Sequence, residues 1–186
     1  MDLCNGVSTP LEVKQLLPTT EDCLKADQTE YQPILGSLIY LAVGTRPDIS
    51  YAVSRLGKFS INPSMIHLAA LKRLLRYVKQ TASLGLCYHR QAITVPLASA
   101  PPIGFCDSDF AGDQSDSKST SGYVFTLAGA AISWKSKKQT LVSLLSTESE
   151  YIGYSEATRE AIWLRRLYHE ITATPYSSQL LYGDNM

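Results

Sequence analysis

The spacing of the apolar residues changes once along this chain, and that change constrains the fold more than any other feature of the sequence. Between residues 31 and 85 apolar side chains recur every three or four positions, as on one face of a helix. From Ile103 onward they alternate every second position, which is typical of half-buried strands. The stretch 92–102 is rich in Ala, Ser and Pro. We therefore expect a small all-helical domain over 31–92 and an α/β domain over 103–186.

The helical domain follows a stretch with little periodicity. Residues 1–30 carry two prolines and scattered charges, and we interpret them as a linker or tail. Pro33, Pro47 and Pro63 then each open an apolar segment, as proline does in the first turn of a helix. These positions predict helices that together form a small layer.

The second domain is predicted to be a mixed sheet with one long packed helix. Period-two alternation marks strands around 103–107, 123–127 and 132–134, with glycines between them, and predicts a three-stranded antiparallel meander. A helical pattern runs from about 147 to 171. Residues 180–184 then predict a fourth strand, so the fold class is α/β.

Three acidic residues, Asp107, Glu150 and Asp184, each fall at the end of a predicted strand or the start of the predicted helix. Asp107 shares a strand face with Ile103 and Phe105, so we expect it over the apolar side of the sheet. A carboxylate buried there is costly unless a cation compensates it. Carboxylate oxygens suit Mg²⁺ or Mn²⁺, so the three acids predict a divalent-metal site.

The helix pattern separates two neighbouring glutamates. Glu150 is continued at steps of three and four by Gly153 and Ala157, which places it on the packed face. Glu148 lies about 200° away around the helix, at roughly 100° per residue, and should point to solvent. The small residues at 153 and 157 should let this helix approach the sheet closely.

Simpler interpretations stay open for each acid taken alone. Thr147-x-x-Glu150 has the spacing of a capping box. Asp184 beside Asn185 suits a turn at the end of the chain. Turn formation is also the simpler interpretation for three further acids, Asp109, Asp113 and Asp116. The combination of three placed acids favours the metal site.

Basic residues are concentrated in one part of a chain whose net charge is zero. Eight Lys or Arg lie between Arg46 and Arg90, against the single acid Asp48. Such a block suggests a polyanionic partner, with a solvated surface as the alternative. Seven cations are candidates for contacts with a nucleic-acid backbone: Lys72, Arg73, Arg76, Lys79, Lys135, Lys137 and Lys138.

Several motifs, in order, resemble the Pol polyproteins of copia-type retrotransposons. YQPILGSLIY at 31–40, TRPDISYAV at 45–53 and KRLLRYVK at 72–79 resemble the end of the reverse transcriptase. DSDFAGD at 107–113, STSGYV at 119–124 and ISWKSKKQ at 132–139 resemble the ribonuclease H domain that follows. STESEY at 146–151 and AIWLR at 161–165 continue that resemblance, which covers residues 31–186.

The resemblance implies a ribonuclease H-like domain that cuts the RNA strand of RNA–DNA hybrids with two Mg²⁺ ions, behind a reverse-transcriptase remnant. By motif match Asp107 is the first acid, Glu150 the helix acid and Asp184 the third. The family carries a fourth acidic ligand further downstream, after a His-x-Arg-Thr-Lys-His stretch, and this sequence stops before it. We therefore expect a C-terminally truncated domain, weak or inactive as a nuclease, whose partners are nucleic acid and the rest of a Pol polyprotein.

Two other functions stay open. The chain can be a nucleic-acid-binding or host-adopted remnant that does not cleave. Arg73-Leu-Leu-Arg76 also fits the RxLR signature of secreted effectors, although no signal peptide is visible at the N-terminus. Four scattered cysteines and the absence of a membrane-length apolar run lead us to expect an intracellular protein, cytoplasmic or nuclear, without a membrane partner.

Overall fold

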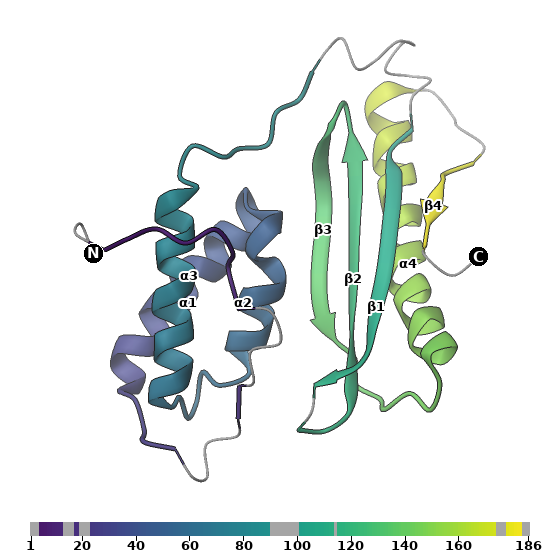
Figure 1. The fold of residues 1–186 in the computed structure, drawn as a ribbon. Helices are drawn as coiled ribbons and strands as arrows, with labels where there is room; N and C mark the ends of the chain where they lie inside the picture. The colour runs from purple at the N-terminus through teal and green to yellow at the C-terminus, as the bar shows by residue number, and fades with distance from the viewer. Residues whose placement is uncertain are drawn as a thin grey trace. The chain divides into compact units, whose positions relative to one another are not determined.

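Two units of different secondary structure make up the chain in this computed structural model (Figure 1). Unit 1 comprises Met1–Gly85 and unit 2 comprises Leu86–Met186. The structure describes residues 4–12, 17–18, 23–89, 101–113, 115–173 and 178–183. Most of the boundary predicted at 92–102 lies outside these residues.

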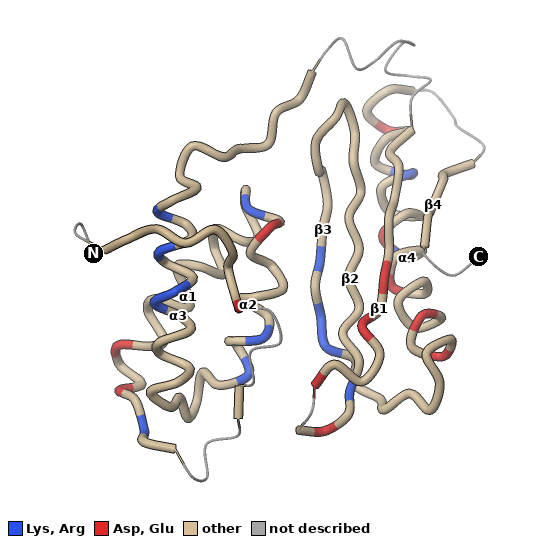
Figure 2. Tube along the Cα trace, in the orientation of Figure 1, with Lys and Arg blue, Asp and Glu red and all other residues tan. Residues whose placement is uncertain are grey.

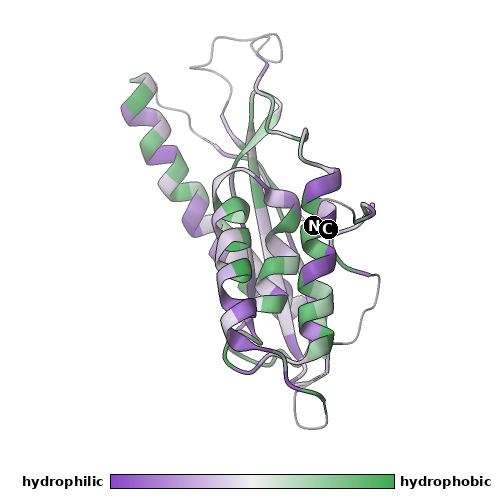
Figure 3. Ribbon diagram, turned by 90° about the vertical axis from the view of Figure 1, so that its left-hand side faces the viewer, coloured by the Kyte–Doolittle hydropathy of each residue, from purple (hydrophilic) through white to green (hydrophobic). Residues whose placement is uncertain are grey.

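Unit 1 is helical. It contains α1 (Gln28–Gly44), the 3₁₀ turn η2 (Pro47–Ile49), α2 (Ser50–Gly57) and α3 (Met65–Gln80). The first helix begins ahead of the predicted start at Pro33, because the Asp27 side chain accepts a hydrogen bond from the Thr29 N–H and caps the helix there. Figure 3 shows hydrophobic and hydrophilic residues interspersed along the helical ribbons.

The core of unit 1 is built from one face of each helix. Tyr31, Leu38 and Leu71 are fully buried in it, and the Tyr31 hydroxyl donates to the Leu56 carbonyl at 2.9 Å. Val7 and other apolar residues of the N-terminal segment pack against the same core. Part of the stretch that we interpreted as a linker or tail is therefore packed against the helices.

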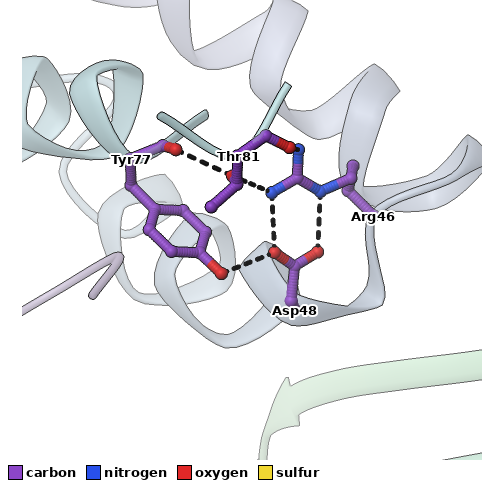
Figure 4. Close-up of polar contacts among 4 residues, drawn as sticks. All are labelled: Arg46, Asp48, Tyr77 and Thr81. Carbon is purple, nitrogen blue, oxygen red and sulfur yellow. Dashed lines mark hydrogen bonds and ion pairs between the residues drawn. The ribbon is translucent and has the colours of Figure 1, made fainter. Parts of the chain in front are cut away.

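A polar cluster joins the connection after α1 to the end of α3 (Figure 4). Arg46, only 7% exposed, donates two hydrogen bonds to the Asp48 carboxylate, at 2.9 and 2.7 Å. It also donates to the Thr81 hydroxyl at 2.6 Å and the Thr81 carbonyl at 3.1 Å, and the Tyr77 hydroxyl donates to Asp48 at 2.9 Å. The hydrogen bond from Arg46 lowers the pKa of Asp48 below its usual value. Arg46, counted above in the basic block, is thus buried and paired.

Unit 2 is a mixed four-stranded sheet with one long helix. Its elements are β1 (Ile103–Asp113), β2 (Lys118–Leu127), β3 (Ala130–Lys138), α4 (Ser146–Thr172) and β4 (Leu181–Tyr182). The strand order is β3-β2-β1-β4. The predicted antiparallel meander is confirmed, and β4 pairs in parallel with β1. The chain is therefore α/β with a mixed sheet.

The helix α4 covers one face of the sheet (Figure 1). Phe125 of β2 is fully buried there against Ala161 and Leu164 of α4. On β1 the covered positions are the small residues Gly104 and Cys106, which are buried. They leave room for the Phe125 ring and for the start of the helix.

The expectation that Asp107 lies over the packed, apolar side of the sheet is wrong. Ile103, Phe105 and Asp107 do share one strand face, but all three are exposed, and the helix lies over the alternate residues. Alternation shows which residues share a face, whereas the contacts of the helix decide which face is buried.

In the part of the chain that the structure describes, no helix combines the length and the apolar composition that a membrane crossing requires.

Candidate functional site

Two of the three predicted acids meet at one small pocket in unit 2. Asp107 of β1 and Glu150 of α4 both line it. Its other lining residues are Cys106, Ser108, Gly153 and Tyr154. The third predicted acid, Asp184, lies outside the described residues.

Strand β1 carries Asp107, one of the residues that line this pocket. The residue is exposed, and it stands opposite Gly122 in the β1–β2 ladder. One carboxylate oxygen, Oδ1, accepts a hydrogen bond from the Ser108 N–H at 2.7 Å. That bond restrains the side chain beside the strand and leaves the carboxylate accessible to a ligand.

Helix α4 holds Glu150 at the edge of its packed face. Ser149 and Gly153 are buried on that face, Glu150 is half-buried and Glu148 is exposed. The predicted separation of Glu148 from Glu150 is confirmed. The centre of the packed face, however, is occupied by Ser149.

The capping-box interpretation of Glu150 does not fit the observed helix start. The N-cap is Leu145, so Thr147 already lies inside the helix. Glu148 instead accepts a hydrogen bond from the Leu144 N–H at 2.7 Å, which satisfies a backbone donor just before the helix. The exposed glutamate therefore serves the helix terminus.

Glycine at position 153 allows the close approach of α4 to the sheet. A Cβ atom there would lie 2.4 Å from Ser108 Oγ and 3.4 Å from Ser121 Oγ. Any larger residue would meet these two serine hydroxyls. The close approach expected from the sequence is confirmed.

A buried polar network contacts Ser108 of the pocket through Ser121, and sequence reasoning missed its central residue, Gln139. This residue follows β3 and is 6% exposed. Its Nε2 donates to Ser121 Oγ at 2.7 Å and to the Ser149 carbonyl at 2.8 Å, and its Oε1 accepts from Ser143 Oγ at 3.2 Å. A single glutamine after a lysine-rich strand carries no periodic signal, so its burial is not readable from the sequence.

The carboxylates fit a hard divalent ion in donor type. Carboxylate oxygens are the ligands that Mg²⁺ and Mn²⁺ prefer, and Asp107 and Glu150 share one pocket. Among the residues that the structure describes, no three His, Cys, Asp or Glu side chains come together as a metal site. A complete site therefore needs a further ligand, for which Asp184 is the candidate from sequence.

The four predicted cations of α3 already have oxygen partners within unit 1. Most of these partners belong to the N-terminal segment 4–12. The contacts are Lys72 with Glu30 Oε1 at 2.7 Å, Arg73 with Glu12 Oε1 at 3.1 Å and Thr9 Oγ1 at 3.0 Å, Arg76 with the Asn5 carbonyl at 2.7 Å, and Lys79 with the Cys4 carbonyl at 3.3 Å. A polyanion at this helix would have to compete with these contacts.

The three predicted cations of β3 also have carboxylate partners. Two of these pairs are longer than those of α3, and the third lies at the β1–β2 turn. Lys135 and Lys137 both approach Glu156 of α4, each at 3.7 Å. Lys138 contacts Asp113 and, at 2.7 Å, Asp116. Figure 2 shows the basic end of β3 and the acidic positions on β1 and α4 within the same unit.

The turn interpretation fits two of the remaining acids. Asp113 accepts hydrogen bonds from the Ser115 N–H and hydroxyl, and Asp116 accepts from the Lys118 N–H. Both acids thus order the connection from β1 to β2.

The fold and this pocket define an α/β protein in which a strand acid and a helix acid line one pocket. Known proteins resemble it along most of its length. A retrovirus-related Pol polyprotein from transposon TNT 1-94 of Nicotiana tabacum is 41% identical over 173 residues, 89% of this chain. Another, from transposon RE1 of Arabidopsis thaliana, is 40% identical over 180 residues, 97% of this chain.

A shorter relative matches over nearly its whole length. A secreted RxLR effector protein of Plasmopara viticola is 46% identical over 134 residues, which is 72% of this chain and 90% of that protein. By contrast, the chain spans 12% of the length of each of the two Pol polyproteins. No protein-family model and no solved structure matches the chain. The chain belongs to the family of copia-type retrotransposon Pol sequences.

Proposed function

We propose that unit 2 is a ribonuclease H-like domain whose ancestral role is hydrolysis of the RNA strand of RNA–DNA hybrids during reverse transcription. The observation that carries this proposal is the pocket that Asp107 and Glu150 both line. By motif match these two residues are the first acid, on a strand, and the helix acid of a ribonuclease H domain. The mixed sheet with one long helix on its face supports it. Unit 1 is then the reverse-transcriptase remnant of the same polyprotein.

The chain's own residues would supply ligands for the metal ions and contacts for the hybrid. Asp107 is open to solvent, so a metal ion that it holds would be accessible to a phosphate of a bound hybrid, whereas half-buried Glu150 is restrained by the packed face of α4. Mg²⁺ ions held by these acids and Asp184 would stabilise the attacking and leaving oxygens of phosphodiester cleavage. Lys135 and Lys137 can contact the hybrid backbone by exchanging Glu156 for phosphate.

A thermal-melt experiment tests the carboxylate site. Mn²⁺ that binds the folded chain raises its midpoint of unfolding by mass action, so we expect a shift at millimolar Mn²⁺ in the wild type. Asp107→Asn and Glu150→Gln should each remove most of the shift. Glu148→Gln is the matched control and should keep it, because Glu148 only caps the helix start. An equal shift in Asp107→Asn would count against the site.

A labelled RNA–DNA hybrid distinguishes two hypotheses, an active nuclease and a nucleic-acid-binding or host-adopted remnant. Its binding and its cleavage by this chain are measured side by side. We expect binding with weak or no Mg²⁺-dependent cleavage, because among the described residues no three His, Cys, Asp or Glu side chains come together as a metal site. Rapid cleavage that Glu150→Gln abolishes would instead show that the acids present suffice.

An effector role is the second candidate, favoured by the likeness to the Plasmopara viticola protein. The structure has Arg73 and Arg76 in α3 with intramolecular partners, and Leu75, the leucine of the motif, is half-buried against the core of unit 1. An RxLR signal read by another protein would need these side chains exposed. Sequencing the 5′ end of the transcript tests the idea, since an in-frame secretory leader would support it and its absence would remove it.

A further inference from the structure

We propose that Gln139 is a positioning residue that fixes the backbone next to Glu150 relative to the strand that carries Asp107. This inference rests on the proposed function, because it concerns the geometry of the same carboxylate site. Gln139 does not line the pocket, and it lies outside both β1 and α4, the elements that carry Asp107 and Glu150.

The hydrogen bonds of Gln139 connect the two acids through their sequence neighbours. Nε2 donates to the Ser149 carbonyl, which is part of the peptide group that joins Ser149 to Glu150. The other Nε2 hydrogen goes to Ser121 Oγ, which lies 3.2 Å from Ser108 Oγ. Ser108 follows Asp107 and donates its N–H to that carboxylate. Three hydrogen bonds therefore connect the Ser149–Glu150 peptide with Ser108, whose own N–H holds the Asp107 carboxylate.

The orientation of the amide is determined by its partners. A carbonyl oxygen only accepts, so the atom facing Ser149 must be the nitrogen. Both Nε2 hydrogens are then used, and Oε1 accepts from Ser143. Gln139 is also tied by its own backbone, because its N–H donates to the Ser119 carbonyl at 2.9 Å. The side chain thus has little freedom, as a residue that orients ligands requires.

The test compares two links between β3 and α4. Gln139→Met keeps the length of the side chain and removes its donors. Ser133→Ala is the matched control, because it removes the 2.7 Å hydrogen bond from Ser133 to Glu160 further along the same helix. Mn²⁺ affinity of the full chain is measured by titration calorimetry, and amide hydrogen exchange of residues 146–153 is followed without metal.

We expect Gln139→Met to weaken Mn²⁺ binding on the order of tenfold, as loss of an outer-shell partner does, and to speed exchange over 146–153. Ser133→Ala should change neither, even where it lowers the melting midpoint. If Gln139→Met does not fold, Ser121→Ala is the alternative. It removes the hydrogen bonds that link Gln139 to Ser108 with a smaller change in side-chain volume, and it should weaken Mn²⁺ binding as well. The proposal would be overturned if Gln139→Met or Ser121→Ala bound Mn²⁺ with wild-type affinity. An equal loss of Mn²⁺ affinity in Ser133→Ala would overturn it too.

Asp107→Asn separates this proposal from the function on which it rests. If the wild type binds Mn²⁺ no better than Asp107→Asn, the proposed carboxylate site is wrong. The role of Gln139 is then decided by exchange alone: faster exchange over 146–153 in Gln139→Met supports it, and unchanged exchange overturns it.

Discussion

At the scale of single residues, His67 shows how one buried side chain joins separate parts of unit 1. The Ser64 N–H donates to His67 Nδ1 at 3.0 Å, so the ring proton is on Nε2, which donates to the Pro18 carbonyl at 3.0 Å. The ring also stacks on Phe59 with centroids 3.6 Å apart. Burial lowers the pKa of His67 below its ordinary 6.5, and the nearby Lys58 cation also lowers it.

We predict that this histidine makes the stability of the chain depend on pH. The unfolded chain takes up a proton near pH 6.5, whereas folded His67 resists it. The contribution is therefore complete above that pH and is lost as the pH falls toward the lower folded pKa. Urea unfolding followed by circular dichroism between pH 7.5 and 5 measures the effect, and in His67→Gln this part of the pH dependence should disappear. An unchanged profile in that variant would assign the effect to other groups.

Gly153 provides a second prediction at this scale. Gly153→Ala places a Cβ against Ser108 Oγ, so one of the serines must move and the Ser108–Ser121 contact is lost. We expect a net loss of about 1 kcal/mol in the free energy of unfolding, since overpacking outweighs the helix propensity of alanine. Gly36→Ala is the control, because nothing lies within 4 Å of its Cβ position. It should stabilise α1 by about 0.5–1 kcal/mol. Equal gains in both variants would contradict the close approach.

At the scale of elements, unit 1 relies on polar links as well as on its apolar core. The Arg46–Asp48 pair ties the connection after α1 to the last turn of α3 through Tyr77 and Thr81. A buried guanidinium with several acceptors is stabilising only while every partner remains, because an orphaned buried charge is costly.

We therefore predict that Arg46→Lys destabilises the chain, by about 2–3 kcal/mol, although it keeps the charge. Lysine cannot reproduce the two parallel hydrogen bonds to Asp48 together with those to Thr81. Arg55→Lys is the control, since Arg55 donates its hydrogen bond to the Tyr51 hydroxyl on an exposed surface. Denaturant titration of both variants gives the comparison, and equal stability would show that the cluster contributes only charge.

At the scale of the whole molecule, the cations divide into two groups that differ in how tightly they are held. Arg73 and Arg76 of unit 1 hydrogen-bond the N-terminal segment at 2.7–3.1 Å. Lys135 and Lys137 of unit 2 approach Glu156 at 3.7 Å. Exposed pairs at that distance are weak and screened by salt.

We predict that unit 2 contributes more than α3 to the binding of an RNA–DNA hybrid. Lys135→Gln with Lys137→Gln should weaken binding and reduce the slope of log affinity against log salt by about 1–2, because two phosphate contacts are removed. Arg73→Gln with Arg76→Gln should change the slope less, because these arginines hold the N-terminal segment. Fluorescence anisotropy across a salt series measures both, and the reverse order of the two double variants would refute the division.

Local sequence patterns were enough to predict the order and type of the main elements. The change of period predicted helices before strands, the meander of β1, β2 and β3, and the long helix α4. It also separated Glu148 from Glu150, because helix phase is a local property set by 3.6 residues per turn. The motifs were enough to indicate the family that the comparisons show.

Which surfaces are covered, and which polar groups meet, depends on how the elements pack. The face of β1 opposite Asp107 is buried because α4 packs there, and alternation alone cannot distinguish the two faces. Gln139 is central because Ser121 and Ser149, distant in sequence, are both brought to it. The N-terminal segment contacts the arginines of α3 across more than sixty positions of sequence, as in the Arg73–Glu12 pair with a separation of 61. Such contacts depend on long-range packing, and no local period encodes them.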